Sequence, residues 1–121
     1  MNTQPSTPLE FRRISQDFAV SGQIWPEQVA DIAASGFKAI ICNRPDEEAP
    51  DQPAFAALEA AAKEAGLSFY NIPVSPAGMT YENVDQTKAA LAEVSGPVFA
   101  YCRSGARSTN LWQFVQQQNE S

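Results

Sequence analysis

The chain has 121 residues, 44% of them hydrophobic, and a formal net charge of −6. This length suits one domain with one core, and the composition predicts a globular fold rather than disorder. The negative charge argues against nucleic acid or an anionic membrane surface as the main partner, so any anion-binding site must be local. The sequence contains no histidine, which excludes acid–base catalysis and metal ligation by that residue type. We expect neither a metal nor a cofactor.

The sequence has no apolar run near the roughly 18 residues that a membrane span needs. Its first residues lack the charged and then apolar layout of a signal peptide. The two cysteines are too few for a disulfide framework, and Cys42, at the end of an apolar run, is expected in the core. We therefore expect a soluble, cytoplasmic protein.

Strand-like and helix-like segments alternate along the chain. We expect a loose tail at residues 1–10 and a single domain over 11–118. Pro26 suits the first turn of a helix, and Gly36 suits its end. Short apolar runs predict strands over 11–14, 18–22, 37–42, 67–74 and 97–101. Helices are predicted over 26–35, 53–65 and 81–94, and a last helix is predicted to start within or just after 101–108 and to fray over 116–121.

This order of elements, β-β-α-β-α-β-α-β-loop-α, predicts a three-layer α/β/α fold with a mainly parallel central sheet. In such sheets, ligands bind beyond the carboxyl ends of the strands. Three loops should meet there: “NRPDEE” at 43–48, “SPAGM” at 75–79, and the turn that follows the strand at 97–101. We expect the functional site between these loops.

The third loop, “YCRSGARS”, places Cys102 between Arg103 and Arg107 at a strand-to-helix junction. The backbone N–H groups of residues 103–108 and the positive end of the following helix can surround an anion. Gly105 allows the positive φ that such a loop usually needs. These groups favour a thiolate, so we expect a lowered pKa and a nucleophilic role for Cys102, with Arg107 binding the anion. The other expected anion-binding residues of the loop are Arg103, Ser104, Gly105, Ala106 and Ser108.

The size of this loop separates two chemistries. Four residues lie between Cys102 and Arg107, whereas cysteine phosphatases use a Cys-x5-Arg loop that accommodates the three oxygens of a phosphoryl group. The shorter loop predicts a narrower cup that fits a single outer sulfur, and “CRSGAR” resembles the loop of rhodanese-type sulfurtransferases. A phosphatase also needs an acid for the leaving alkoxide. “VSPAGM” has none, which leaves Asp46, Glu47 and Glu48 as the nearby substitutes.

Four longer stretches of the chain carry a resemblance to a known family: “AVSGQIWPE”, “GFKAIICNRPDEE”, “AAAKEAGLSFYNIPV” and “GPVFAYCRSGARSTNLW”. In this order, from about residue 17 to about 113, they resemble the beta-lactamase hydrolase-like protein family in its phosphatase-like domain. The resemblance implies a dual-specificity-phosphatase-like fold, and relatives fused to a persulfide dioxygenase domain imply sulfide or persulfide metabolism. Many relatives have His where this chain has Tyr101, so weaker activation of the Cys102 thiol is expected. Carried over by position, the rim of the site consists of Gln23, Asn43, Arg44 and Asp46.

Our leading hypothesis is a rhodanese-like sulfurtransferase that forms a persulfide on Cys102, with a small-molecule sulfur donor and a persulfide dioxygenase as partners. The alternative is a protein-tyrosine or dual-specificity-like phosphatase acting on a phosphate-like anion. In it, Cys102 forms a phosphocysteine, Arg107 binds the phosphoryl oxygens and Asp46 is the acid. A second alternative is an anion-binding or redox-sensing module in which Cys102 is merely oxidised. Arg44 and Gln23 are expected to contact the ligand.

Overall fold

The computed structural model of the chain describes residues 8–120. Its strands and helices follow the predicted order. The strands are β1 (Arg12–Ser15), β2 (Phe18–Ser21), β3 (Ala39–Cys42), β4 (Ser68–Asn71) and β5 (Val98–Tyr101). The helices are a 3-10 turn η1 (Pro26–Gln28), α1 (Val29–Ala34), α2 (Phe55–Glu64), α3 (Tyr81–Glu93) and α4 (Ala106–Glu120). None of these helices is both long enough and apolar enough to cross a membrane, a finding that covers the described residues only.

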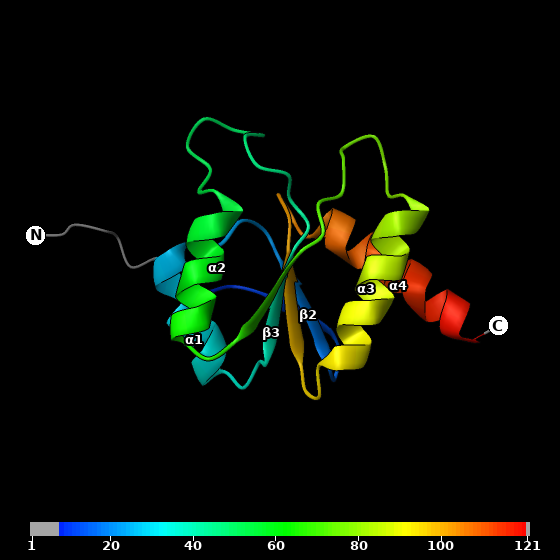
Figure 1. Ribbon diagram of the computed structural model, residues 1–121, viewed down its shortest axis with the longest axis horizontal. Helices are drawn as coiled ribbons and strands as arrows, with labels where there is room; N and C mark the ends of the chain where they lie inside the picture. Colours follow the sequence, from blue (N-terminus) through cyan, green and yellow to red (C-terminus); the bar gives the residue numbers. More distant parts are fainter. Residues whose placement is uncertain (1–7, 121) are drawn as a thin grey trace, which may run out of the picture.

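Within residues 8–120 the strands form one five-stranded sheet in the order β1-β2-β5-β3-β4. The edge strand β1 is antiparallel to β2, and the pairs β2–β5, β5–β3 and β3–β4 are parallel. Figure 1 shows α1 and α2 on one face of the sheet and α3 and α4 on the other. The predicted three-layer α/β/α fold with a mainly parallel sheet is therefore confirmed.

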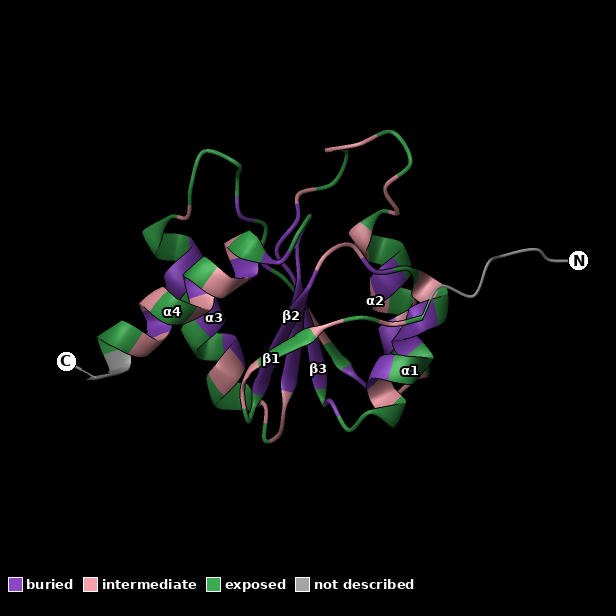
Figure 2. Cartoon of the chain, turned by 180° about the vertical axis from the view of Figure 1, so that it is seen from behind, coloured by how far each residue is buried: buried purple, intermediate pink, exposed green. Residues whose placement is uncertain are grey.

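The central strand β5 is buried on both faces, because successive side chains of a strand point to opposite layers. Phe99 and Tyr101 pack into the cluster shared with α1 and α2, whereas Val98 and Ala100 pack into the cluster shared with α3 and α4. Figure 2 shows the strands as the buried centre of the molecule. The loop that follows β5 therefore leaves from the most firmly packed part of the fold.

Two segment ends and part of the tail differ from the predictions. The strand predicted over 67–74 ends at Asn71, although the N–H groups of Ile72 and Val74 still donate to the carbonyl oxygens of Cys42 and Asn43 (both 2.9 Å). Helix α4 continues through 116–120, where fraying was predicted, because no glycine or proline interrupts it. Leu9, placed in the predicted tail, packs against the core. The tail residues 1–7 lie outside the described residues.

Candidate active site

The loop that carries Cys102 leaves β5 at the carboxyl end of the sheet, between the ends of β2 and β3. The Cys102 N–H donates to the carbonyl oxygen of Ser21 (3.2 Å), so the chain stays attached to β2 for one residue beyond the strand. Gly105 then turns the backbone with a φ of 96°, a conformation that strains residues with a side chain, and α4 begins at Ala106. The thiol is thereby held at the N-terminal end of a helix.

Cys102 is buried, with 1% of its surface exposed. Burial alone raises the pKa of a thiol, but hydrogen bonds oppose it here: from the backbone of Ser108 and Ser104, from the Ser108 side chain and from the backbone of Gly105. The Gly105 N–H lies 3.0 Å from Sγ. The hydrogen bonds prevail and lower the pKa of Cys102, which favours the nucleophilic thiolate.

Ser108 links this loop to the neighbouring strands. Its hydroxyl lies 2.8 Å from Oδ1 of Asn43, and Nδ2 of Asn43 donates to the carbonyl oxygen of Ile72 (2.8 Å). Since a hydroxyl has one proton, Ser108 can donate it either to Asn43 or to the sulfur of Cys102. Asn43, expected on the rim, is instead a buried support that joins the ends of β3 and β4 to the first turn of α4.

Arg107 is held by a carboxylate from the loop after β3. Its Nη1 and Nη2 donate to Oε2 and Oε1 of Glu48, both at 2.8 Å, and Nη1 also donates to the carbonyl oxygen of Val74 (2.7 Å). Hydrogen bonding to Arg107 keeps the pKa of Glu48 below its usual range, and the same contact raises the pKa of Arg107. Within the described part of the chain, Nε–H and the second N–H of Nη2 have no acceptor. This edge of the guanidinium can bind two oxygens of an anion.

Arg44 and Gln23 extend the same network. Nε of Arg44 donates to Oε1 of Glu48 (3.1 Å), and its Nη1 donates to Oε1 of Gln23 (3.0 Å). Arg44 is only 6% exposed, so its charge is balanced locally by Glu48. The structure therefore brings Gln23, Arg44 and Arg107 together through one carboxylate.

The remaining site candidates are less enclosed. Oδ1 of Asp46 accepts from the Phe55 N–H (2.9 Å), at the start of α2. Arg103, Ser104 and Ala106 have exposed side chains, and Ala106 N–H lies 3.4 Å from the Ser104 hydroxyl. Of these three, Ser104 gives Cys102 a backbone hydrogen bond, whereas the anion-binding roles of Arg103 and Ala106 and the role of Asp46 as an acid stay predictions.

Tyr101, which stands where many relatives have His, points away from the loop that it precedes. It is 1% exposed and packs in the cluster beneath α1 and α2. Its side chain is hydrogen-bonded to Cys42, and burial is the main reason that its pKa is raised. The residue before Cys102 therefore contributes to packing, and the loop backbone and Ser108 supply the hydrogen bonds to Cys102.

Glu48 is the site residue that the sequence analysis missed, since it was considered only as a substitute acid. The preceding Glu47 has a φ of 68°, the one positive value among the described non-glycine residues. Such a conformation costs about 1–3 kcal/mol and needs compensation from its surroundings. The ion pairs that Glu48 forms with Arg107 and Arg44 can offset this conformational cost. Only the presence of both arginines near the predicted loops could have hinted at this partner.

A buried cysteine of lowered pKa just beyond a central parallel strand, followed by an arginine in the first turn of a helix, is typical of a cysteine-phosphatase-like α/β domain. The model of one family, “Beta-lactamase hydrolase-like protein, phosphatase-like domain”, matches residues 10–119. The chain belongs to this family, as the quoted stretches predicted.

Curated relatives agree with this assignment. The chain is 37% identical over 100 residues to a beta-lactamase hydrolase-like protein of Agrobacterium fabrum, and 35% identical over 99 residues to one of Xylella fastidiosa strain Temecula1. The matches cover 83% and 82% of this chain but 23% of each relative. The chain thus spans less than a quarter of the length of these proteins.

Solved structures share the fold. A “putative phosphatase” from Neisseria meningitidis Z2491 is 33% identical, with a TM-score of 0.78 over 87% of this chain and 75% of that one. A “putative phosphatase” from Shewanella putrefaciens CN-32 has a TM-score of 0.78 at 20% identity, covering 92% and 70%. The core catalytic domain of a PP-IP phosphatase from S. cerevisiae, in complex with citrate, has a TM-score of 0.68 at 14% identity, covering 94% and 68%. The last two similarities establish the fold alone.

These findings show that the sulfurtransferase hypothesis is wrong and that the phosphatase alternative fits better. The predicted persulfide, sulfur donor and dioxygenase partner lose their support with it. The error came from equating loop length with the size of the cup. Because α4 begins at Ala106, donors to Cys102 continue past Arg107 to Ser108, so four intervening residues do not limit the cup to one sulfur atom. A phosphate-like anion fits this class of site.

Proposed function

We propose that this domain is a cysteine-dependent phosphatase that hydrolyses phosphate monoesters through a phosphocysteine on Cys102. The observation that supports it most directly is the buried sulfur whose pKa is lowered by the hydrogen bonds of the loop. Arg107 lies close enough for the charge of Cys102 to raise the pKa of its guanidinium. A nucleophile and a phosphoryl-binding cation therefore share one loop.

In the first step, the Cys102 thiolate attacks phosphorus, an S–P bond forms, and the bond from phosphorus to the ester oxygen breaks. The leaving oxygen takes a proton from an acid or from water. In the second step, water attacks phosphorus, the S–P bond breaks, and inorganic phosphate leaves as the thiolate is restored. The backbone N–H groups of the loop and the open edge of Arg107 would bind the phosphoryl oxygens, where charge is concentrated in both steps.

Glu48 acts through Arg107 and is a positioning residue rather than an acid. Two hydrogen bonds fix the plane of the guanidinium, and the edge bearing Nε–H is left for the ligand. The lowered pKa of Glu48 keeps it a carboxylate, which can accept but not donate a proton. Asp46 remains our proposal for the acid, and it would have to leave the Phe55 N–H to act.

Hydrolysis of 4-nitrophenyl phosphate, followed by acid quenching and mass spectrometry, tests this function. We expect turnover, inhibition by orthovanadate, and a gain of one phosphoryl group on the peptide that contains Cys102. Cys42→Ala, which removes the other buried thiol, is the matched control and should keep both the turnover and the adduct. Hydrolysis that persists in Cys102→Ser, or no hydrolysis of any monoester by the intact protein, would overturn the proposal.

A further inference from the structure

A pocket lies between the turn that joins β1 to β2 and the helices α3 and α4. Figure 2 shows these two helices together on one face of the sheet, on the side of β1 and β2. The volume of the pocket, about 340 Å³, falls within the range of roughly 300–1,000 Å³ that is typical of sites for small molecules. We call it the Trp112 pocket, and its apolar side chains are Phe18, Leu91, Val94, Val98 and Trp112.

The Trp112 pocket is separate from the catalytic site. Val98, which lines the pocket, is the first residue of β5, whereas Cys102 follows the last residue of that strand. Four steps of about 3.3 Å along an extended strand place the two residues roughly 13 Å apart. Among the described residues, the wall contains none of the loop at 102–108. A ligand in this pocket therefore leaves Cys102 accessible to a substrate.

Trp112 is the largest side chain of this wall. Its indole stacks on the ring of Phe18, with the ring centroids 5.8 Å apart and the planes at 26° to each other. Phe18 is buried in this pair, whereas Trp112 is only half-buried, so part of the indole stays accessible. An indole attracts apolar rings, and it is also the best aromatic partner for a cation.

Asp17 is the charged residue of the wall, and its backbone is fixed on both sides. Its N–H donates to the hydroxyl of Ser15 (3.1 Å), and its carbonyl oxygen accepts from the N–H of Val98 (2.9 Å). Lys38 packs its stem against Gly96 at the edge of the pocket, but it forms no ion pair with Asp17 in the described part of the chain. The carboxylate of Asp17 can therefore take a cation from solution.

The carboxyl end of α3 adds negative potential to the same pocket. Leu91 and Val94, which line it, come from the last turn of α3 and the residue after it, and that turn has no basic residue. Helices α1 and α2 each end with a backbone N–H that returns to their last carbonyl groups, whereas within residues 8–120 no such N–H follows α3. These carbonyl groups carry the negative end of the helix dipole, which favours a cation.

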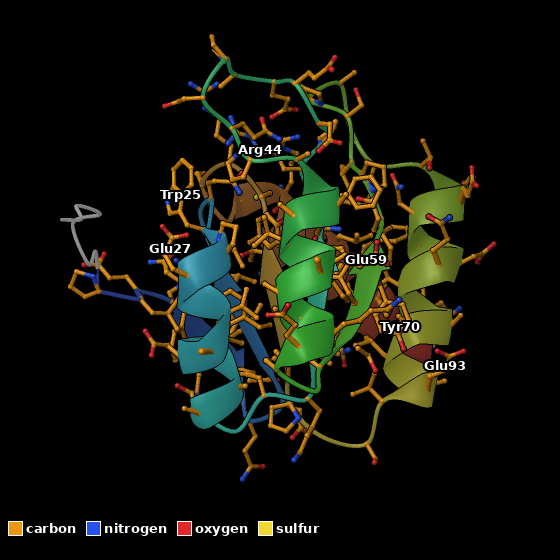
Figure 3. The ribbon with its side chains drawn as sticks, turned by 60° about the vertical axis from the view of Figure 1, so that its left-hand side comes forward. Trp25, Glu27, Arg44, Glu59, Tyr70 and Glu93 are labelled. Carbon is orange, nitrogen blue, oxygen red and sulfur yellow. The ribbon has the colours of Figure 1, made fainter. Side chains whose placement is uncertain are left out.

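Glu93, the last residue of α3, is already engaged elsewhere. Figure 3 shows Glu93 beside Tyr70, whose hydroxyl donates to it (2.8 Å). Glu93 does not line the Trp112 pocket, so Asp17 and the end of α3 supply the negative charge there.

We propose that the Trp112 pocket binds a small organic cation, namely a primary ammonium ion that carries one aromatic ring. The ring packs on Trp112 and Leu91, and the ammonium group lies between the carboxylate of Asp17 and the end of α3. A carboxylate or phosphate in its place would be repelled by both. This binding site goes beyond the proposed phosphatase function and does not rest on it.

Titration with 2-phenylethylamine and with 2-phenylethanol tests the site, because the two compounds share ring and length and only the amine is charged at neutral pH. The reporter is the indole N–H signal of Trp112 in two-dimensional 1H–15N NMR spectra. The chain has two tryptophans, so Trp25→Phe assigns this signal. We expect a saturable shift of the Trp112 signal, with the amine binding roughly threefold to tenfold more tightly than the alcohol.

Two variants change the charge of the wall and leave Trp112 in place. Asp17→Asn removes the carboxylate and Gln116→Lys adds a cation, and each should abolish the preference for the amine. Their matched controls make the same changes outside the pocket: Asp31→Asn on α1, at the other face of the sheet, and Gln113→Lys at an exposed position of α4. Both controls should keep the preference.

A Trp112 signal that does not move, or that moves without saturating, would overturn the proposal. Equal affinities for the amine and the alcohol, or a preference that survives in both Asp17→Asn and Gln116→Lys, would overturn it as well. Cys102→Ser should bind the amine as the unchanged protein does, whether or not the chain hydrolyses phosphate esters. Displacement of the amine by orthovanadate would assign the ligand to the catalytic loop and contradict a separate site.

Discussion

The two cysteines of this chain lie one register position apart on neighbouring strands, and their pKa values shift in opposite directions. Cys42 ends β3 and Cys102 follows β5, and the two are 2% and 1% exposed. Burial raises the pKa of both thiols, yet the net pKa of Cys42 is raised and that of Cys102 is lowered. Burial alone therefore does not determine which thiol becomes a nucleophile.

The difference lies in the hydrogen-bonding groups that each sulfur meets. At Cys42 burial raises the pKa most and the charge of Asp46 adds to it, whereas hydrogen bonds with Tyr101 and with the backbone of Arg44 lower it by less. Cys102 lies one residue beyond β5, and its sulfur accepts hydrogen bonds from N–H groups of its loop and of the start of α4. At Cys102 the hydrogen bonds outweigh burial and favour the thiolate, whereas at Cys42 burial outweighs the hydrogen bonds and favours the thiol.

The largest expected effect is the loss of the nucleophile. Cys102→Ser should reduce kcat/KM for an aryl phosphate by at least about a thousandfold, because a neutral hydroxyl replaces a thiolate. Cys42→Ala should change it less than about threefold. The comparison between the two cysteines breaks down if steady-state kinetics give similar losses for the two variants.

A smaller loss of kcat/KM should follow when the hydrogen-bond donors around Cys102 are displaced. In Gly22→Ala, the new Cβ would lie 2.9 Å from the carbonyl oxygen of Arg103, so the loop must shift. We expect kcat/KM to fall by about a hundredfold, the usual cost of displacing a reacting group by roughly 1 Å. Gly66→Ala is the control, because Gly66 has a φ of 82° and the space around its Cα is open, so an added Cβ meets no neighbouring atom. It should lower the free energy of unfolding but not kcat/KM.

The ion pair behind Arg107 can be tested by Glu48→Gln. Loss of the charged bidentate contact should let the guanidinium move, so we expect kcat to fall about tenfold. The KM for the phosphate ester should not rise, because the same change removes a negative charge beside the anion site. A raised KM with unchanged kcat would show that Glu48 serves substrate binding instead. Glu59→Gln, a change of charge on α2, controls for the net charge.

The smallest expected effect concerns the pH dependence of Cys102. Ser108→Ala removes a hydrogen bond that favours the thiolate, so the pKa of Cys102 should rise towards the value of an ordinary thiol. The acidic limb of kcat/KM against pH should then move to higher pH. At pH 6 we expect a loss of about threefold to tenfold that disappears in alkaline solution, since a hydrogen bond of this kind contributes about 1 kcal/mol.

Thr87→Ala is the control for Ser108→Ala, because Thr87 is another buried hydroxyl of a helix and donates within α3. Both variants should lose stability, but Thr87→Ala should leave the pH profile of kcat/KM in place. A uniform loss of activity at every pH in Ser108→Ala would mean that Ser108 supports the loop without tuning the thiol.

Much of the fold could be predicted from the spacing of apolar residues and from the glycines that end helices. Apolar runs of four to six residues located the central strands, and Gly36 and Gly66, both with positive φ, end helices as their positions indicated. Strand ends were less predictable: β4 ends at Asn71, although Ile72 and Val74 still donate to the backbone at the end of β3. Helix α4 runs to Glu120, and the fraying predicted for its end stays a prediction.

The site was predictable only where one segment carries it. The run “CRSGAR” between a strand and a helix was enough to locate a thiol among N–H donors, because neighbouring residues build that environment. Loop length was a poor guide to substrate, since the first turn of α4 supplies donors that counting residues between Cys102 and Arg107 leaves out.

The sequence by itself thus determined the alternation of elements, the position of Cys102 and the presence of a cation beside it, all of which depend on local spacing. Tertiary structure alone decided that Glu48 holds Arg107 across 59 positions of the chain. It also decided that two similarly buried thiols differ in pKa. These features depend on which groups meet at the carboxyl edge of the sheet, and that meeting is fixed by strand order and packing rather than by any single segment.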